Sequence, residues 1–193
     1  MQTLIEARIE EIQNVLKSSQ CFPVAELEKF ISELIETFSK GKKIAFIGNG
    51  GSAAEALHIA AEFTGKCVYE HKPVAALCLN ESISAITAIG NDFGFDEIFA
   101  RQVEAVMVSG DMLVALSTSG RSPNILRALE VAKTKGINAY LWTGINEIVL
   151  PGVQTWSVPS NSTPRVQEVH LMWGHIIAEA FEIALNNQLG GNS

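Results

Sequence analysis

Cysteine is scarce in this chain of 193 residues, and its few positions form no recognisable framework. The three cysteines, Cys21, Cys67 and Cys78, are odd in number and show no Cys-x-x-Cys spacing. This pattern argues against the disulfide framework of a small secreted protein. We therefore expect the protein to reside in a reducing compartment.

Positive charge and long apolar runs are also lacking. The 14 Lys and Arg residues are outnumbered by 21 Asp and Glu, so the net charge is -7, which argues against nucleic acid as a partner. No apolar run reaches the length of a membrane span. Because Glu6, Arg8, Glu10 and Glu11 interrupt the first residues, they do not form the apolar core of a signal peptide. We expect a cytoplasmic protein without a membrane partner.

What is present is an apolar chain of single-domain length, with 47% hydrophobic residues and a mean hydropathy of +0.19. Residues 1–40 have the spacing of two amphipathic helices, which Pro23 separates. We expect one domain over residues 1–193, in which 1–40 are a helical extension, 41–187 an α/β core and 188–193 a flexible tail. The extension can cover the sheet or pack against another subunit, and the second option favours oligomers.

Strand and helix patterns alternate after Gly41. The predicted strands are 43–47, 73–79, 111–116, 137–142 and 154–158, and the predicted helices are 52–64, 82–89, 95–107, 123–135 and 165–186. Alternation of this kind predicts a parallel sheet with helices on both faces. The fold class is therefore α/β, a three-layer αβα sandwich that is Rossmann-like and is preceded by two helices.

Two serine-rich loops follow predicted strands and precede predicted helices. They are Gly-Asn-Gly-Gly-Ser at 48–52 and Ser-Thr-Ser-Gly-Arg-Ser at 117–122. Hydroxyls and free N–H groups at a helix N-terminus favour an anion, and phosphate is the obvious candidate. Both loops fall at the carboxyl ends of strands, which predicts a single crevice.

Two other interpretations of the first loop remain open. Gly48, Gly50 and Ala53 satisfy a dinucleotide-binding fingerprint. That fingerprint also needs an acidic residue closing the second strand, where Asn80 stands, whereas Glu70 precedes the strand. The loop can also be a tight turn without any ligand.

Four donor side chains lie on two predicted helices. His58 and Glu62 are four residues apart and share a helix face, and Gln167 and His175 are eight apart. Two imidazoles, a carboxylate and an amide oxygen suit zinc or another divalent transition ion better than calcium. The alternative is that Glu62 and His175 only satisfy each other or solvent.

These motifs together resemble the bacterial phosphoheptose isomerases of the sugar isomerase (SIS) fold. The matching segments are 48–52, 58–62, 90–94 (Gly-Asn-Asp-Phe-Gly), 117–122 and 165–170 (Arg-Val-Gln-Glu-Val-His), followed by His175. The two serine-rich loops are shared by SIS proteins generally. The heptose branch is distinguished by residues similar to the pairs His58/Glu62 and Gln167/His175, together with Asn91 and Asp92.

The resemblance implies isomerisation of D-sedoheptulose 7-phosphate to D-glycero-D-manno-heptose 7-phosphate, for lipopolysaccharide or another surface glycan. It implies that the phosphate is held by Ser52, Ser117, Thr118, Ser119 and Ser122, that the sugar is contacted by Asn49, Gly50, Gly51, Asn91, Asp92 and Gln167, and that one zinc per subunit is bound by His58, Glu62, Gln167 and His175. It also implies a homotetramer with active sites near subunit interfaces. The chain departs from many relatives at residues 143–147 and from some at Pro164, which affects loop contacts and the fine substrate preference more than the reaction.

The chemistry supports the same assignment, because aldose–ketose isomerisation moves a proton between C1 and C2 through an enediol. Glu62 is the predicted shuttling base and His175 its general acid/base partner. Glu168 and His170 are predicted to be outer or packing residues. The rival hypothesis is a non-catalytic SIS module, such as a protein associated with a replication initiator or a phosphosugar sensor, which needs no complete acid/base and metal set.

Overall fold

A five-stranded parallel sheet forms the centre of the computed structural model, which describes residues 1–18, 21, 24–145 and 148–190. Its strands lie in the order β2-β1-β3-β4-β5, and every neighbouring pair is parallel. The strands are β1 Ile44–Gly48, β2 Ala76–Cys78, β3 Met112–Leu116, β4 Asn138–Thr143 and β5 Val153–Ser157. The predicted α/β class with a parallel sheet is confirmed.

The central strands are apolar throughout because helices cover both of their faces. Every residue of β1 and β3 is buried, and Ile44 pairs with Met112 in their register. A strand buried on both faces has no alternation of polar and apolar residues. This explains why the apolar runs at 43–47 and 111–116 located these strands from sequence.

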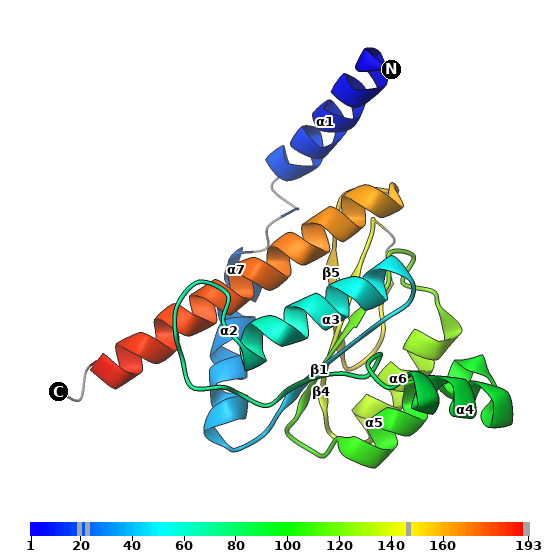
Figure 1. Ribbon diagram of the computed structural model, residues 1–193, viewed down its shortest axis with the longest axis vertical. Coiled ribbons are helices and arrows are strands. Elements are labelled where there is room, and N and C mark those ends of the chain that lie inside the picture. Colours follow the sequence, from blue (N-terminus) through cyan, green and yellow to red (C-terminus); the bar gives the residue numbers. More distant parts are fainter. Residues whose placement is uncertain (19–20, 22–23, 146–147, 191–193) are drawn as a thin grey trace.

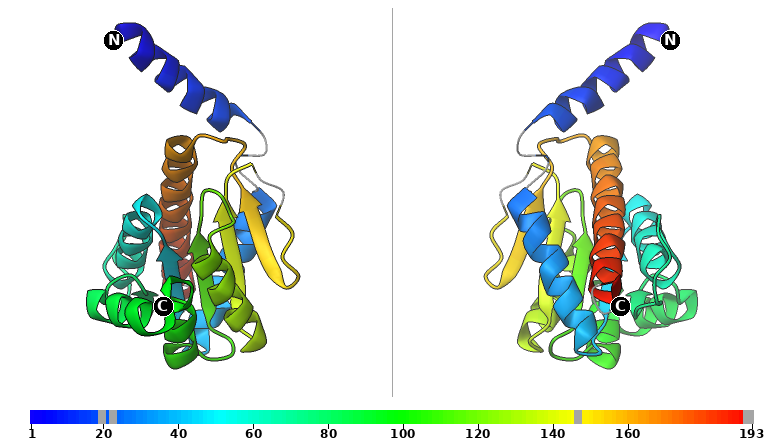
Figure 2. Two further views of the ribbon diagram at one scale, coloured as in Figure 1. Left: turned by 90° about the vertical axis from the view of Figure 1, so that its right-hand side faces the viewer. Right: turned by 90° about the vertical axis from the view of Figure 1, so that its left-hand side faces the viewer.

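Two groups of helices make the outer layers (Figures 1 and 2). One face carries α2 Val24–Ser39, α3 Gly51–Thr64 and α7 Thr163–Gly190, and the other side carries α4 Ile83–Phe93, the short 3₁₀ helix η1 Phe95–Glu97, α5 Ala100–Val106 and α6 Pro123–Thr134. The core of the first face contains Phe30, Phe46, Phe63, Trp142 and Trp173. The core of the second contains Ile47, Phe99, Leu113, Leu129 and Leu141. Side chains at alternate positions along the strands pack into one core or the other.

Helix α1, Gln2–Lys17, projects away from the body of the molecule (Figures 1 and 2). It is separate from α2, as predicted, although Phe22 and Pro23 of the predicted break lie outside the described residues. Its apolar face is largely uncovered, with Leu4, Ile5 and Ile9 each at least half exposed. None of the helices in the described part of the chain contains an apolar stretch that could span a bilayer.

Several predicted boundaries were wrong. The helix predicted at 82–89 continues to Phe93 as α4. Strand β2 covers only Ala76–Cys78 instead of 73–79, because β1 begins at Ile44, opposite Ala76, and offers no partner before it. The predicted helix 95–107 is divided into η1 and α5. The last helix begins at Thr163 instead of 165 and continues to Gly190, so residues 188–190 of the predicted tail are helical, while 191–193 lie outside the described residues.

The strand order creates a crevice beside β1. Strand β1 lies between β2 and β3, and the helices after β1 and β3, α3 and α6, go to opposite faces of the sheet. Ligands of open α/β sheets bind at such a switch point, outside the carboxyl ends of the strands. Both serine-rich loops lie there.

Candidate functional site

The two serine-rich loops line a common cavity of about 200 Å³. Its lining residues are Asn49, Gly51, Ser52, Leu116, Ser117, Thr118, Ser119, Ser122, Thr163 and Gln167. Three helices begin here, since Gly51 opens α3, Ser122 precedes α6 and Thr163 opens α7. Free N–H groups and positive dipole ends from three helices favour an anion. We refer to this cavity as the cradle.

Glycines allow the first loop to pass close to α7. Gly50, the N-cap of α3, has a positive φ of 56°, which a side chain would strain. A Cβ added to Gly51 would lie only 2.4 Å from Nε2 of Gln167. The contact between the α3 N-terminus and the Gln167 side chain therefore requires glycine at position 51.

A pair of amides ties the two loops together. Asn49 Nδ2 donates to Asn124 Oδ1 and Asn124 Nδ2 donates to Asn49 Oδ1, both at 2.9 Å. Asn124 is 1% exposed and belongs to the first turn of α6. The pair fixes the Asn49 side chain at the rim of the cradle.

The second loop folds so that its hydroxyls gather. Gly120 N–H donates to the Ser117 carbonyl at 2.9 Å, and Arg121 N–H donates to Ser119 Oγ at 3.2 Å. The Oγ atoms of Ser117 and Ser122 lie 3.4 Å apart. Hydroxyls from both ends of the loop therefore face one point, as an anion site needs.

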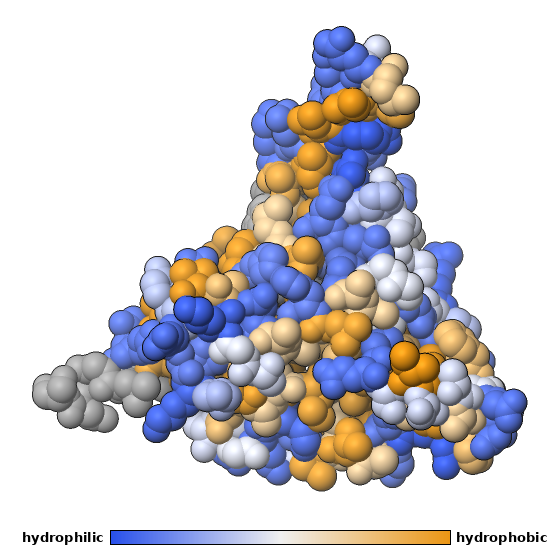
Figure 3. Space-filling view, viewed as in Figure 1, coloured by the Kyte–Doolittle hydropathy of each residue, from blue (hydrophilic) through white to orange (hydrophobic). Residues whose placement is uncertain are grey.

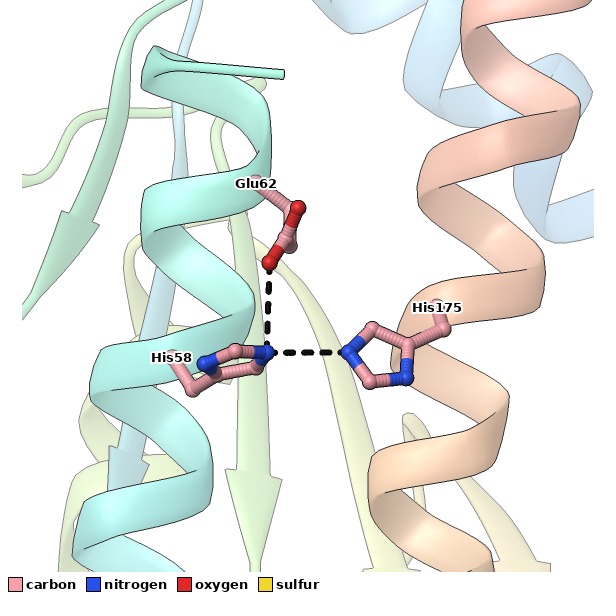
Figure 4. A group of neighbouring side chains, drawn as sticks. All are labelled: His58, Glu62 and His175. Atoms are coloured by element: carbon pink, nitrogen blue, oxygen red, sulfur yellow. Dashed lines mark hydrogen bonds and ion pairs between the residues drawn. The ribbon is translucent and has the colours of Figure 1, made fainter. Parts of the chain in front are cut away.

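A second group of polar side chains lies further along α3 and α7 (Figure 4). His58 Nε2 is 2.9 Å from His175 Nε2 and 3.2 Å from Glu62 Oε1. One ligand atom from each of the three residues lies within 4.8 Å of the others. Two imidazole nitrogens and one carboxylate oxygen at this spacing fit a zinc-type ion. The three residues form a possible metal-binding group, which we call the histidine group.

The fourth predicted ligand, Gln167, lies at the cradle. Its Nε2 is 3.5 Å from Ser52 Oγ, and it lines the cavity. Eight helical residues, about 12 Å along the axis, separate it from His175. Its contact with a metal ion stays a prediction.

Asn91 and Asp92 do not line the cradle. They are exposed residues near the end of α4, and Asn91 Nδ2 donates to Asp92 Oδ1 at 2.7 Å. Helix α4 has no buried residue although it is apolar, and Ile83 is 75% exposed. The role of Asn91 and Asp92 in sugar binding stays a prediction.

His170 and Glu168 behave as the sequence predicted. His170 is fully buried beside the Thr143 carbonyl, and burial lowers its pKa to about 4, so the ring is neutral. Glu168 forms an ion pair with Arg165. Glu70 lies exposed in the loop before β2 rather than at a strand end, so it is not placed to hold a ribose.

Sequence reasoning missed three residues at or near the site. Thr163 lines the cradle, but the predicted helix began two residues after it. Asn124 lies two residues after Ser122, in the first turn of α6, and from there its side chain reaches Asn49 of the first loop. Glu55 lies on α3 between the two sets of polar residues, and its spacing from His58 was readable from sequence.

Comparison with known proteins identifies the family. The family model of the SIS domain matches residues 9–144 of this sequence. A phosphoheptose isomerase of Bradyrhizobium sp. (strain BTAi1) is 44% identical over 168 residues, covering 86% of this chain and 85% of the relative. The chain belongs to the phosphoheptose isomerase family of SIS domain proteins.

Further members of this family agree along nearly the whole chain. The phosphoheptose isomerase of Helicobacter pylori (strain 26695) is 41% identical over 180 residues, which cover 92% of this chain and 88% of that one. The solved structure of phosphoheptose isomerase from Neisseria gonorrhoeae aligns with a TM-score of 0.86 at 32% identity, covering 94% of this chain and 98% of the other. The SIS fold predicted from the motifs is thereby confirmed.

Proposed function

We propose that this phosphoheptose isomerase family member converts D-sedoheptulose 7-phosphate to D-glycero-D-manno-heptose 7-phosphate, for lipopolysaccharide or another surface glycan. One observation carries the proposal. Helices α3 and α7 contribute side chains to both the cradle and the histidine group, which are separated by about two helical turns. A sugar phosphate with its phosphate and carbonyl at opposite ends of the chain suits that separation.

The phosphate end belongs in the cradle. Ser52, Ser117, Thr118, Ser119 and Ser122 supply hydroxyls there, and the N-termini of three helices supply N–H groups. Binding energy gained at the phosphate holds the reacting carbons beside the acid and base.

The carbonyl end belongs beside Glu62 and His175. Glu62 removes a proton from C1 of the ketose while His175 donates a proton to the C2 oxygen, which gives the enediol. His175 then takes the proton from the C1 oxygen, and Glu62 returns its proton to C2. Each group ends in its starting state, and acid–base catalysis of this kind contributes on the order of 10²–10⁴-fold.

A zinc ion, one per subunit, fits the donor set of His58, Glu62 and His175. When bound, such an ion supplies Lewis-acid polarisation of oxygens near the reacting carbons. Gln167 joins this set only if its side chain leaves Ser52. The ring of His58, half exposed, orients Glu62 through their 3.2 Å contact.

The test of the base uses Glu62→Gln protein with sedoheptulose 7-phosphate in deuterated water. We expect isomerisation and deuterium incorporation at C2 to fall at least a hundredfold, by the magnitude usual for a general base. The matched control is Glu130→Gln, an exposed glutamate of α6 that pairs with Arg127. Wild-type exchange rates in the Glu62 variant would remove Glu62 from the mechanism.

A substrate series separates this enzyme from a non-catalytic SIS module. Purified protein is assayed with ketose phosphates of five, six and seven carbons. We expect turnover to be greatest with the seven-carbon substrate. Binding of sugar phosphates without any turnover would favour a sensor or an interaction protein instead.

We also propose that the protein is a homotetramer. Support comes from apolar surface that one chain leaves uncovered, on α1 at Leu4, Ile5 and Ile9 and on α4 and η1 at Ile83, Phe93 and Phe95. Figure 3 shows apolar residues along the projecting α1. The exposed apolar side chains on each of these elements are suited to contacts with other subunits.

A further inference from the structure

Two glutamates are buried among the residues that the structure describes, and they differ in how their carboxyl oxygens are hydrogen-bonded. Glu182, 1% exposed, accepts three backbone N–H groups, from Cys67, Val68 and Tyr69. Glu55 is 8% exposed, and among the described residues neither of its carboxyl oxygens has a hydrogen-bond partner. A buried polar group without a partner is costly and calls for an explanation.

The position of Glu55 on α3 supplies an explanation for its unpaired carboxyl group. Gly51, Glu55, His58 and Glu62 follow the spacing i, i+4, i+7 and i+11, which places them on one narrow stripe of the helix. Gly51 approaches Gln167 on α7 at one end of this stripe. His58 contacts His175 on α7 at the other end. Glu55 therefore lies between the cradle and the histidine group, about one turn from each.

Burial also changes the charge of this carboxyl. Burial raises the pKa of Glu55 to about 7, and the nearby Ser52 hydroxyl opposes the rise. Near neutral pH the group is close to half protonated. Either form offers oxygen acceptors, and a hydroxyl donor that reaches it would satisfy an atom that the free protein leaves unpaired.

We propose that Glu55 is a substrate-binding residue that accepts hydrogen bonds from hydroxyl groups on the middle carbons of the sugar phosphate. This rests on the proposed function, in which the phosphate occupies the cradle and the carbonyl end lies at the histidine group. The carbon chain of the sugar joins these two ends and therefore runs past the turn of α3 that carries Glu55. A buried acceptor of this kind rejects analogues that lack the hydroxyl, because binding them leaves it unpaired. Glu55 is thus a determinant of specificity for a polyhydroxylated chain.

The experiment compares the variants Glu55→Gln and Glu55→Met with wild type. Three quantities are measured: kcat and KM for sedoheptulose 7-phosphate, inhibition by inorganic phosphate, and the melting temperature. We expect Glu55→Met to raise KM roughly ten- to a hundredfold, as loss of a hydrogen bond to a charged group does. Glu55→Gln, which keeps an oxygen acceptor, changes KM less. The inhibition constant of phosphate stays within about twofold, and the melting temperature of Glu55→Met is equal to or above that of wild type, since an unpaired buried carboxyl has been removed.

The control is Glu33→Gln, which alters a carboxyl on α2 that is hydrogen-bonded to Tyr140 and is remote from the cradle lining. It should leave KM unchanged. An unchanged KM in Glu55→Met would overturn the inference. So would an equal loss of phosphate affinity, which would make Glu55 a support for Ser52, or a lowered melting temperature with parallel loss of activity, which would make it structural.

The failure of this inference is distinguishable from failure of the proposed function. Active wild-type protein with unaffected Glu55 variants overturns the role of Glu55 alone. Wild-type protein that does not convert sedoheptulose 7-phosphate overturns the proposed function, and the role of Glu55 with it.

Discussion

The Nε2 atoms of His58 and His175 lie 2.9 Å apart, although 117 positions separate these residues in the chain. Two imidazoles on facing helices can approach this closely when one ring donates a hydrogen bond to the other. The same two nitrogens are also two of the three ligand atoms of the possible metal-binding group. The packing of α3 against α7 thus places these two imidazole nitrogens side by side in the protein alone. Close packing of the two helices requires glycine at position 174 of α7, because a Cβ there would lie 2.5 Å from the Ile59 side chain.

Metal removal should destabilise the protein. An ion that binds only the folded state adds about 2.7 kcal/mol at a free concentration 100 times its Kd. We expect a chelator to lower the melting temperature of wild type but not of His58→Ala/His175→Ala protein, which has lost the site. Elemental analysis should find zinc in wild type at one per subunit. Equal chelator effects on both proteins would contradict the assignment of these ligands.

Gly51→Ala should disturb the site more than the fold. Its new Cβ would meet the end of the flexible Gln167 side chain, which can move aside, so we expect the free energy of unfolding to change by less than about 1 kcal/mol. The displaced amide no longer lies beside Ser52, and KM should rise. The check is a double-mutant cycle with Gln167→Ala, in which the Gly51→Ala effect on KM disappears. Additive effects would show that the contact is unimportant.

Asn124→Ala should loosen the link between the two loops. It removes both hydrogen bonds of Asn49, and leaving a buried polar group unpaired costs about 1–3 kcal/mol. We expect lower stability together with a lower kcat/KM. The control is Gln102→Ala, which removes an amide bonded to the carbonyls of Leu79 and Ile98, and should lower stability without changing KM.

The stability of wild type relative to Glu55→Gln should depend on pH. Burial raises the pKa of Glu55 to about 7, above its ordinary value of 4.5, so the folded state holds a proton that the unfolded state releases between these values. The stabilising effect of protonation is present below pH 4.5 and is lost as the pH rises through 7, by on the order of 3 kcal/mol. Urea denaturation at pH 5 and pH 8 measures the difference. Parallel pH profiles for the two proteins would argue against a raised pKa.

Disrupting the apolar face of α1 should reduce the size of the assembly. Ile5→Asp/Ile9→Asp places charges where both side chains are half exposed in one chain. We expect light scattering to report a smaller particle than the proposed tetramer. Glu6→Gln is the control on the same helix and should leave the mass unchanged.

The sequence predicted the order and type of the elements well because local patterns determine them. Apolar runs located β1 and β3, and helical spacing located α3 and α7. The extent of β2 depended on where its partner strand β1 begins, which is a tertiary contact that the local pattern does not contain. The pairing of His58 with His175 followed from the family motifs. The contact of Gln167 with Ser52 did not, because side-chain rotamers depend on packing that spacing alone does not encode.

The lining of the cradle contains no lysine or arginine among the described residues. The attraction that we propose for a phosphate dianion therefore rests on hydroxyls and on the ends of α3, α6 and α7, which act over short distances and in fixed directions. Screening by dissolved ions weakens such contacts much less than it weakens long-range attraction between free charges. The cradle thus selects an anion by its shape. We expect its affinity for that anion to change little between dilute buffer and the ionic strength of a living cell.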